Sequence, residues 1–128
     1  MATKSAFHSA AQINTARGTP MPAWTPYLAL YIGDPASGGF EVAGGGYARQ
    51  LVVFGAPTAN LCFNTNAIVF PNPSADWGIV THLVLTDAVT GGNWRISYEA
   101  GGTDIQRTVV SGGTPVTVGV GSIAYGEP

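Results

Sequence analysis

The chain has 128 residues, a length typical of one domain with a core large enough to fold without disulfides. Only 9% of the residues are charged, against about 25% in an average domain, and the net charge is −2. This composition argues against the basic surface of a nucleic-acid-binding protein. It also leaves a largely neutral surface, which favours a permanent partner.

No segment approaches the length of a membrane span, and the first residues lack the apolar core of a signal peptide. We therefore expect neither membrane insertion nor export by a signal peptide. The single cysteine, Cys62, cannot form an internal disulfide, so folding in a reducing cytosol is the simplest expectation. Its apolar neighbours Leu61 and Phe63 predict a buried, inert thiol.

Residues 1–26 lack strand alternation and end in a proline-rich run, which predicts an N-terminal arm. Residues 5–16 have the spacing of a short helix. A flexible tail is one interpretation, and an arm that orders by lying on a neighbouring subunit is the other. The candidate contact residues of such an arm are Phe7, Pro20, Pro22, Trp24 and Pro26.

The alternation of residues 27–32 predicts a strand with Leu28, Leu30 and Ile32 on one face. Turn signals then separate further short apolar segments. Extended segments are predicted over residues 40–42, 47–54, 61–70, 105–110 and 116–120, and an irregular tail over 124–128.

The central feature is a predicted β-hairpin over Asp76–Glu99. Its first strand, residues 77–87, is apolar on both faces. Its second strand alternates, which places Trp94, Ile96 and Tyr98 in the core and Arg95 on a face that should meet water. Residues 88–92 form the connection, in which two glycines can take positive φ angles.

These elements predict an all-β protein: a single β-sandwich or jelly-roll-like barrel of about seven to nine short strands over residues 27–128, with an extended N-terminal arm over residues 1–26.

Catalytic and metal-binding patterns are lacking in the sequence. There is no nucleophile motif, and two histidines with one cysteine do not have the spacing of a zinc site. His82 fits a packed, hydrogen-bonded histidine better than a general base. The acidic residues lie mostly at predicted turns, where such side chains usually bond nearby backbone N–H groups. We therefore expect no enzyme activity, metal or cofactor.

Five segments together resemble a family of small tailed-bacteriophage structural proteins: LALYIGDPASGG, EVAGGGYARQLVVFG, AIVFP, DWGIVTHLVLTDAVTGGN and RTVVSGGT. The resemblance covers residues 27–114, whereas residues 1–26 and the end of the chain depart from the family pattern. The motif residues are expected to form scaffold rather than an active site. They are Gly44, Gly45, Gly46, Tyr47, Arg49, Trp77, Gly78, Thr81, His82, Asp87, Gly91, Gly92 and Asn93.

The resemblance implies a non-enzymatic virion structural protein, assembled in the host cytoplasm. The favoured role is a capsid decoration or cement protein that bridges major capsid protein subunits on the head, as a homo-oligomer and most simply a trimer. One alternative is a tail fibre, baseplate or minor tail component bound to tail proteins, and another is a host-surface carbohydrate-binding module.

The arm supplies the first testable prediction. Deleting residues 1–26 should leave a folded β domain but weaken its incorporation into virions, as measured by circular dichroism and by the protein content of purified particles. An unfolded truncation product would instead place the arm in the core.

Overall fold

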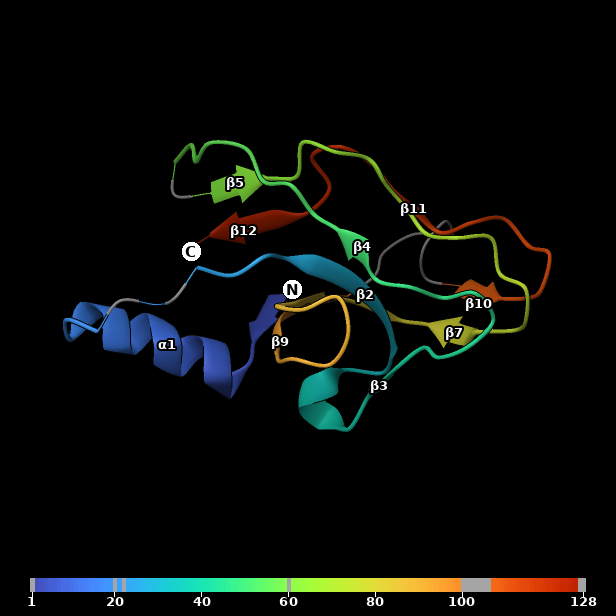
Figure 1. Cartoon of the computed structure of the whole chain (residues 1–128), viewed down its shortest axis with the longest axis horizontal. Helices are drawn as coiled ribbons and strands as arrows, with labels where there is room; N and C mark the ends of the chain where they lie inside the picture. The colour runs from blue at the N-terminus through green and yellow to red at the C-terminus, as the bar shows by residue number, and fades with distance from the viewer. Residues whose placement is uncertain (1, 20, 22, 60, 100–106, 127–128) are drawn as a thin grey trace.

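The computed structural model describes residues 2–19, 21, 23–59, 61–99 and 107–126, and in these ranges twelve strands, one α-helix and one 3₁₀ turn are formed (Figure 1). In chain order the elements are β1 (Ala2–Lys4), α1 (Ala6–Ala16), β2 (Tyr27–Ile32), η1 (Pro35–Ser37), β3 (Phe40–Glu41), β4 (Gln50–Leu51), β5 (Leu61–Phe63), β6 (Ile68–Val69), β7 (Gly78–Val80), β8 (His82–Thr86), β9 (Trp94–Glu99), β10 (Arg107–Val109), β11 (Thr117–Val118) and β12 (Ala124–Gly126).

The first layer is a six-stranded sheet with the order β1-β9-β8-β2-β3, in which β4 also pairs with β2. All of its pairings are antiparallel. The hairpin β8–β9 therefore lies at the centre of this sheet, as the sequence predicted. In β2, Leu28 and Leu30 are fully buried and Ile32 packs against the core, so the predicted apolar face of this strand is confirmed.

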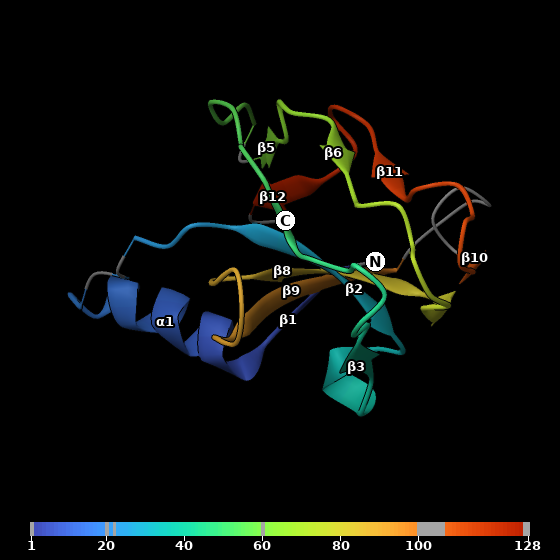
Figure 2. The same ribbon diagram turned by 45° about the vertical axis from the view of Figure 1, so that its right-hand side comes forward.

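The second layer consists of three two-stranded antiparallel ladders, β5–β12, β6–β11 and β7–β10. Figure 2 shows these ladders in a row across one face of the main sheet. The all-β class is confirmed. Because the sheets do not close on one another, the arrangement is a sandwich rather than a barrel.

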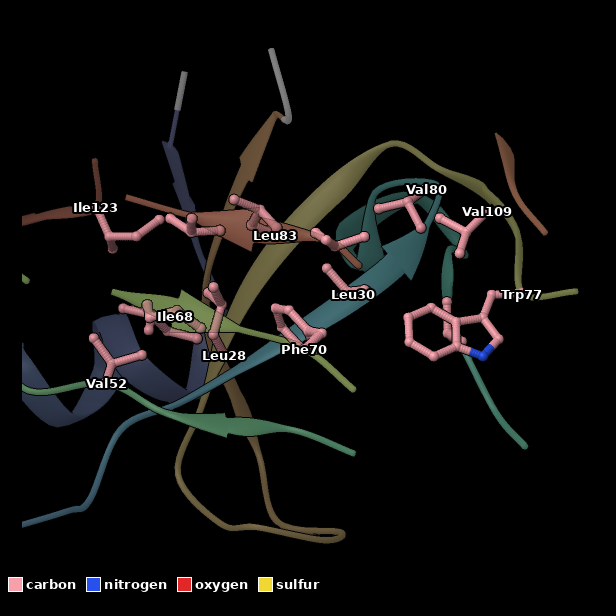
Figure 3. Packing of buried hydrophobic residues seen from close by; sticks show 14 of the residues in the cluster. Leu28, Leu30, Val52, Ile68, Phe70, Trp77, Val80, Leu83, Val109 and Ile123 are labelled. Atoms are coloured by element: carbon pink, nitrogen blue, oxygen red, sulfur yellow. The ribbon is translucent and has the colours of Figure 1, made fainter. Parts of the chain in front are cut away.

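The hydrophobic core fills the space between the two layers (Figure 3). Leu28 and Leu30 of the main sheet face Ile68 and Phe70 of the second layer, while Trp77 lies at one end. The buried members are Leu28, Leu30, Val42, Val52, Ile68, Phe70, Trp77, Val80, Leu83, Leu85, Ile96, Val109, Val116, Val118 and Ile123.

The predicted first strand of the hairpin is broken at Thr81. Residues 78–80 pair with β10 in the second layer, whereas residues 82–86 join the main sheet. The break is held by Thr81, whose backbone N–H donates to Tyr31 and whose hydroxyl accepts from Gly33 at 2.7 Å. A segment that serves both layers is covered on both sides, which explains why both of its faces are apolar.

The predicted alternation of β9 is also wrong at its start. The pairing of β8 with β9 shifts between Leu85 and Thr86, because Leu85 pairs with Ile96 and Thr86 with Trp94, so Arg95 is an extra residue in the register. Arg95 and Ser97, expected on the face that meets water, are 5% and 2% exposed, and Trp94 is half-buried and outside the core. A bulge of this kind reverses the alternation locally.

The N-terminal residues fold back onto the main sheet. β1 pairs with the edge of β9, and α1 follows at one end of the sheet (Figure 1). The predicted helix is confirmed, and it begins where the Ser5 hydroxyl accepts a hydrogen bond from the His8 backbone N–H at 3.0 Å. The division of the chain at residue 26 stays a prediction.

Other strands are shorter than expected. Only Gln50–Leu51 of the predicted strand over residues 47–54 is regular, and such breaks raise the strand number above the predicted seven to nine. The predicted irregular tail is wrong for Ala124–Gly126, which pair with β5 as β12. Residues 105, 106, 127 and 128 lie outside the described residues. Within the described ranges, no helix is long and apolar enough to cross a membrane.

Candidate functional site

The first of three features with functional potential is an ion-pair network around Arg49. Its Nε and Nη2 donate to the Glu41 carboxylate at 2.7 and 2.9 Å, and its Nη1 donates to the carbonyl oxygens of Ala88 and Gly91 at 2.7 and 2.8 Å. Tyr47 also donates to Glu41, at 2.6 Å, and accepts from the Leu30 backbone N–H. One side chain thus joins the GGGYARQ segment to the hairpin loop.

The electrostatics of this network follow from burial and pairing. Burial by itself raises the pKa of Glu41, but the hydrogen bonds from Arg49 and Tyr47 outweigh it, so that the net shift is downward. The hydrogen bond to Glu41 raises the pKa of Arg49. Burial, followed by the hydrogen bond to Glu41, raises the pKa of Tyr47. The network is therefore a fixed ion pair at neutral pH.

The contact between Gly45 and Trp77 explains why the middle residue of the Gly44–Gly46 segment must be glycine. The Trp77 Nε1 donates to the Gly45 carbonyl at 3.0 Å, and a Cβ on Gly45 would lie 2.7 Å from that nitrogen. Gly45 also has a φ of +60°, a conformation that other residues adopt at a cost. Tyr47 packs edge-on against Trp77 at 5.6 Å. Gly44 and Gly46 complete the turn, each with positive φ.

The hairpin loop is held by Asp87. Its Oδ1 accepts from the Asn93 backbone N–H at 2.8 Å, and its Oδ2 accepts from Arg95 at 3.1 Å. Burial acts to raise the pKa of Asp87, but the hydrogen bonds from Asn93 and Arg95 outweigh it and lower the pKa. Gly92 has a φ of +69°, and a side chain there would collide with the Asp87 carboxylate. Gly91 also has positive φ.

The remaining motif residues also have structural roles. Gly78 has a φ of +94° where β7 begins. The half-buried His82 lies 2.9 Å from the Thr81 hydroxyl through its Nδ1. Asp34 and Asp76 accept hydrogen bonds from the backbone N–H groups of Ala36 and Ser111, as expected for acidic residues at turns. Asp104 lies outside the described residues.

The second feature, which we call the arm socket, consists of Phe7, His8, Trp24, Arg95 and Tyr125. The Arg95 guanidinium carbon lies 4.6 Å from the centre of the Phe7 ring and 4.8 Å from that of Trp24. His8 Nδ1 lies 3.2 Å from Arg95 Nη1, and its Nε2 lies 2.9 Å from the Tyr125 hydroxyl. The socket therefore joins α1, the proline-rich run, β9 and β12.

Of the predicted arm residues, Phe7 and Trp24 are brought together in the socket. Phe7 is half exposed and Trp24 is largely covered, each against residues of its own chain. Pro26 is half-buried, and Pro20 and Pro22 lie outside the described residues. The sequence reasoning missed His8, Arg95 and Tyr125. The sequence offered one indication of this site, a histidine within a predicted helix of mostly small residues. That indication does not reveal its partners, Arg95 and Tyr125, which lie 87 and 117 positions away.

Two open hollows lie beside Trp24. A polar one of about 470 Å³ is lined by Ala23, Trp24, Thr25, Asp87 and Arg95. An apolar one of about 400 Å³ is lined by Trp24, Pro26, Val52, Val53, Phe54 and Tyr125. The charged groups of the polar hollow are already paired with each other at 3.1 Å.

The third feature, the outer face, is the surface of the second layer that points away from the core. Strand alternation places Val69 and Ile79 there, because their neighbours Ile68 and Val80 are buried. Val69 and Ile79 are 53% and 56% exposed, and Phe63 on the next ladder is 44% exposed. Most of the layer is neutral, since residues 50–75 and 108–126 contain no Asp, Glu, Lys or Arg, and its strand β10 begins with one charged residue, Arg107.

Reactive side chains are few in the described ranges. No three His, Cys, Asp or Glu side chains there are grouped to hold a metal ion. The predicted burial of Cys62 is only partial, and its sulfur lies 3.5 Å from the Tyr125 carbonyl oxygen. Burial raises the pKa of this thiol, which lowers its reactivity.

A neutral β-sandwich whose polar side chains bind its own loops is typical of a structural protein that works through its surfaces. A sequence family described as podophage GP4 fiber I protein gp80 matches residues 3–125. Because this match covers almost the whole chain, the protein belongs to that family of tailed-phage virion structural proteins. No curated protein matches the chain.

The match confirms the resemblance seen in the sequence and extends it. It includes α1 and β11, which fall in the parts that seemed to depart from the family pattern. The arm and the C-terminal strands are therefore part of the family's sequence pattern. The description as a fibre protein favours the tail-fibre alternative over the capsid decoration role that the sequence favoured.

Proposed function

We propose that this protein is a non-enzymatic subunit of a tail fibre and that it acts by assembly. The observation that carries the proposal is the family match over residues 3–125, whose description is a fibre protein. The site geometry is compatible with it, because Arg49, Asp87 and Arg95 are all engaged in internal bonds.

Immunogold labelling of intact virions with an antibody to this chain tests the location. Label confined to the tail is expected. Label distributed over the head would overturn the fibre role and restore capsid decoration. Particles that lack the protein, prepared from a deletion phage, are the control for antibody specificity.

The outer face is the proposed contact with a second copy of the chain. Two neutral surfaces can approach without charge repulsion or the desolvation of ions. Val69 and Ile79 are also large apolar side chains exposed on two ladders of this layer, and apolar surface of this kind is what a contact with another copy would bury. Both points support the homo-oligomer expected from the sequence, with the trimer as its simplest form.

Replacing Val69 and Ile79 together by aspartate should weaken self-association at least about 10-fold. Full burial of such a side chain contributes about 1.5–3 kcal/mol, and since each is only about half exposed, the pair contributes about that amount; about 1.4 kcal/mol corresponds to a tenfold change in affinity. Sedimentation of the wild type and the variant over a concentration series measures the effect and gives the stoichiometry.

The matched control is Val89→Asp, because Val89 is 54% exposed but lies in the hairpin loop of the first layer. It should associate like the wild type. Thermal melts of each variant show whether its fold is retained. Equal association of the wild type and the Val69→Asp, Ile79→Asp variant would argue against this face as the contact.

A further inference from the structure

His8 is the one buried side chain among the described residues of α1, and it is 0% exposed. Both of its ring nitrogens are within hydrogen-bonding distance of strands in different layers, Arg95 in β9 and Tyr125 in β12. The Trp24 ring packs edge-on against the imidazole at 5.7 Å. This side chain therefore connects the arm with both layers of the sandwich.

The partners determine the protonation state of His8. A guanidinium has only donors, so Nδ1 must accept from Arg95 through its lone pair. Nε2 then carries the proton and donates to the Tyr125 hydroxyl. Protonation of Nδ1 would direct an N–H at the Arg95 N–H and place two positive charges 3.2 Å apart on side chains that are 0% and 5% exposed.

Among the described residues, the other charged groups near the socket offset that repulsion only in part. Asp87 in the hairpin loop pairs with Nε and Nη2 of Arg95, on the nitrogens that do not face His8. Lys4 of β1 adds a further positive charge beside α1, where it donates to Gln12 at 3.0 Å. Tyr125 contributes its hydroxyl to the socket, and Phe7 and Trp24 contribute aromatic rings.

We propose that His8 is an acid-sensitive clasp, which holds β1 and α1 on the sheet while it is neutral and releases them when it is protonated. Release would open the β9 edge of the main sheet, whose backbone groups β1 now pairs through Ala2, Thr3 and Lys4. The arm is then a conformational device of the subunit, independent of where the subunit is placed in the virion.

The size of the effect follows from linkage. If the docked arm accepts only neutral His8 and the released arm has a histidine of ordinary pKa, about 6.5, opening should increase up to about 30-fold between pH 7.5 and pH 5.0. The free energy of docking is thus at its full value above that pKa and decreases as the pH falls below it.

Hydrogen exchange of the full-length protein at the two pH values, corrected for intrinsic rates, measures the opening. Peptides from residues 2–16 should exchange up to about 30-fold faster at pH 5.0, while peptides from β2 and β8 should not change. His8→Gln should abolish the acceleration, because an amide can accept and donate but does not titrate. His82→Gln removes the only other histidine and should behave like the wild type.

Arm exchange that is equal at both pH values in the wild type, or acceleration that persists in His8→Gln, would overturn the proposal. If His8→Gln does not dock at pH 7.5, NMR of wild-type His8 decides instead. The Cε1–H signal of His8 should change only together with loss of β1 protection. A histidine that titrates normally while β1 stays protected would refute the clasp.

Discussion

Replacing Arg49 by alanine should lower the free energy of unfolding by about 2–4 kcal/mol at pH 7. The substitution leaves the Glu41 carboxylate without its ion-pair partner and removes the donor to two loop carbonyls. Breaking a buried ion pair on one side costs about 3–5 kcal/mol, and the lower range applies because the Glu41 side chain is still 24% exposed. Urea denaturation followed by circular dichroism gives the value.

The pH dependence of this loss has a definite sign. In the wild type the pKa of Glu41 is lowered, so its contribution to stability is present above the unfolded pKa and is lost as the pH falls through the folded value. Without Arg49, burial is the dominant influence and raises the pKa of Glu41, so the destabilisation should be largest at neutral pH. Near pH 4, where Glu41 can be protonated, the difference between variant and wild type should shrink.

Two variants control for the loss of a positive charge. Arg17→Ala removes an exposed arginine whose guanidinium donates to the Asn14 side chain at 3.3 Å, and it should change stability by less than about 0.5 kcal/mol. Arg49→Lys keeps the charge but not the guanidinium fork, so its loss should be intermediate. An Arg49→Ala variant as stable as Arg17→Ala would show that the network does not hold the loop.

Replacing Trp77 by alanine should cost about 3–5 kcal/mol, the range for removing a large aromatic side chain from a core. Trp77 is 4% exposed and fills one end of the cluster between the layers (Figure 3). Its Nε1 also donates to the Gly45 carbonyl, which would lose one of its two donors and keep the Ser74 backbone N–H. Urea denaturation followed by circular dichroism measures the loss without relying on tryptophan fluorescence.

Trp94→Ala is the matched control, because it removes the same side chain from a half-buried position outside the core. Its cost should be clearly smaller. The loss of stability in Trp77→Phe should lie between the losses in Trp94→Ala and Trp77→Ala. Phenylalanine keeps most of the side-chain volume but loses the hydrogen bond, which makes a net contribution of about 0.5–1.5 kcal/mol. Equal costs for the two alanine variants would contradict the assignment of Trp77 to the core.

The sequence carried enough information for the class of fold and for the clearest local elements. Alternation in residues 27–32 is strong because one face of β2 meets the core along its whole length. The hairpin connection was readable from its paired glycines, and the helix over residues 5–16 from its spacing. Each of these signals is local, so neighbouring residues are sufficient to produce it.

Only the tertiary structure decided the details that depend on distant residues. The change of layer at Thr81 is set by bonds to Tyr31 and Gly33, and the bulge at Arg95 by pairing with β8. In the sequence, the residues around the layer change and around the bulge have the pattern of an ordinary continuous strand, so neither feature can be recognised there.

The arm shows the same limit most clearly. Composition predicted a largely neutral surface that favours a permanent partner, and the proline-rich run predicted an N-terminal arm. The sequence motifs predicted a family of phage structural proteins, and the family match confirms that prediction. The socket that joins His8 to Arg95 and Tyr125 brings together residues 87 and 117 positions apart, and no local pattern encodes such contacts. Burial of a polar side chain depends on what folds over it, and the three-dimensional arrangement alone determines that.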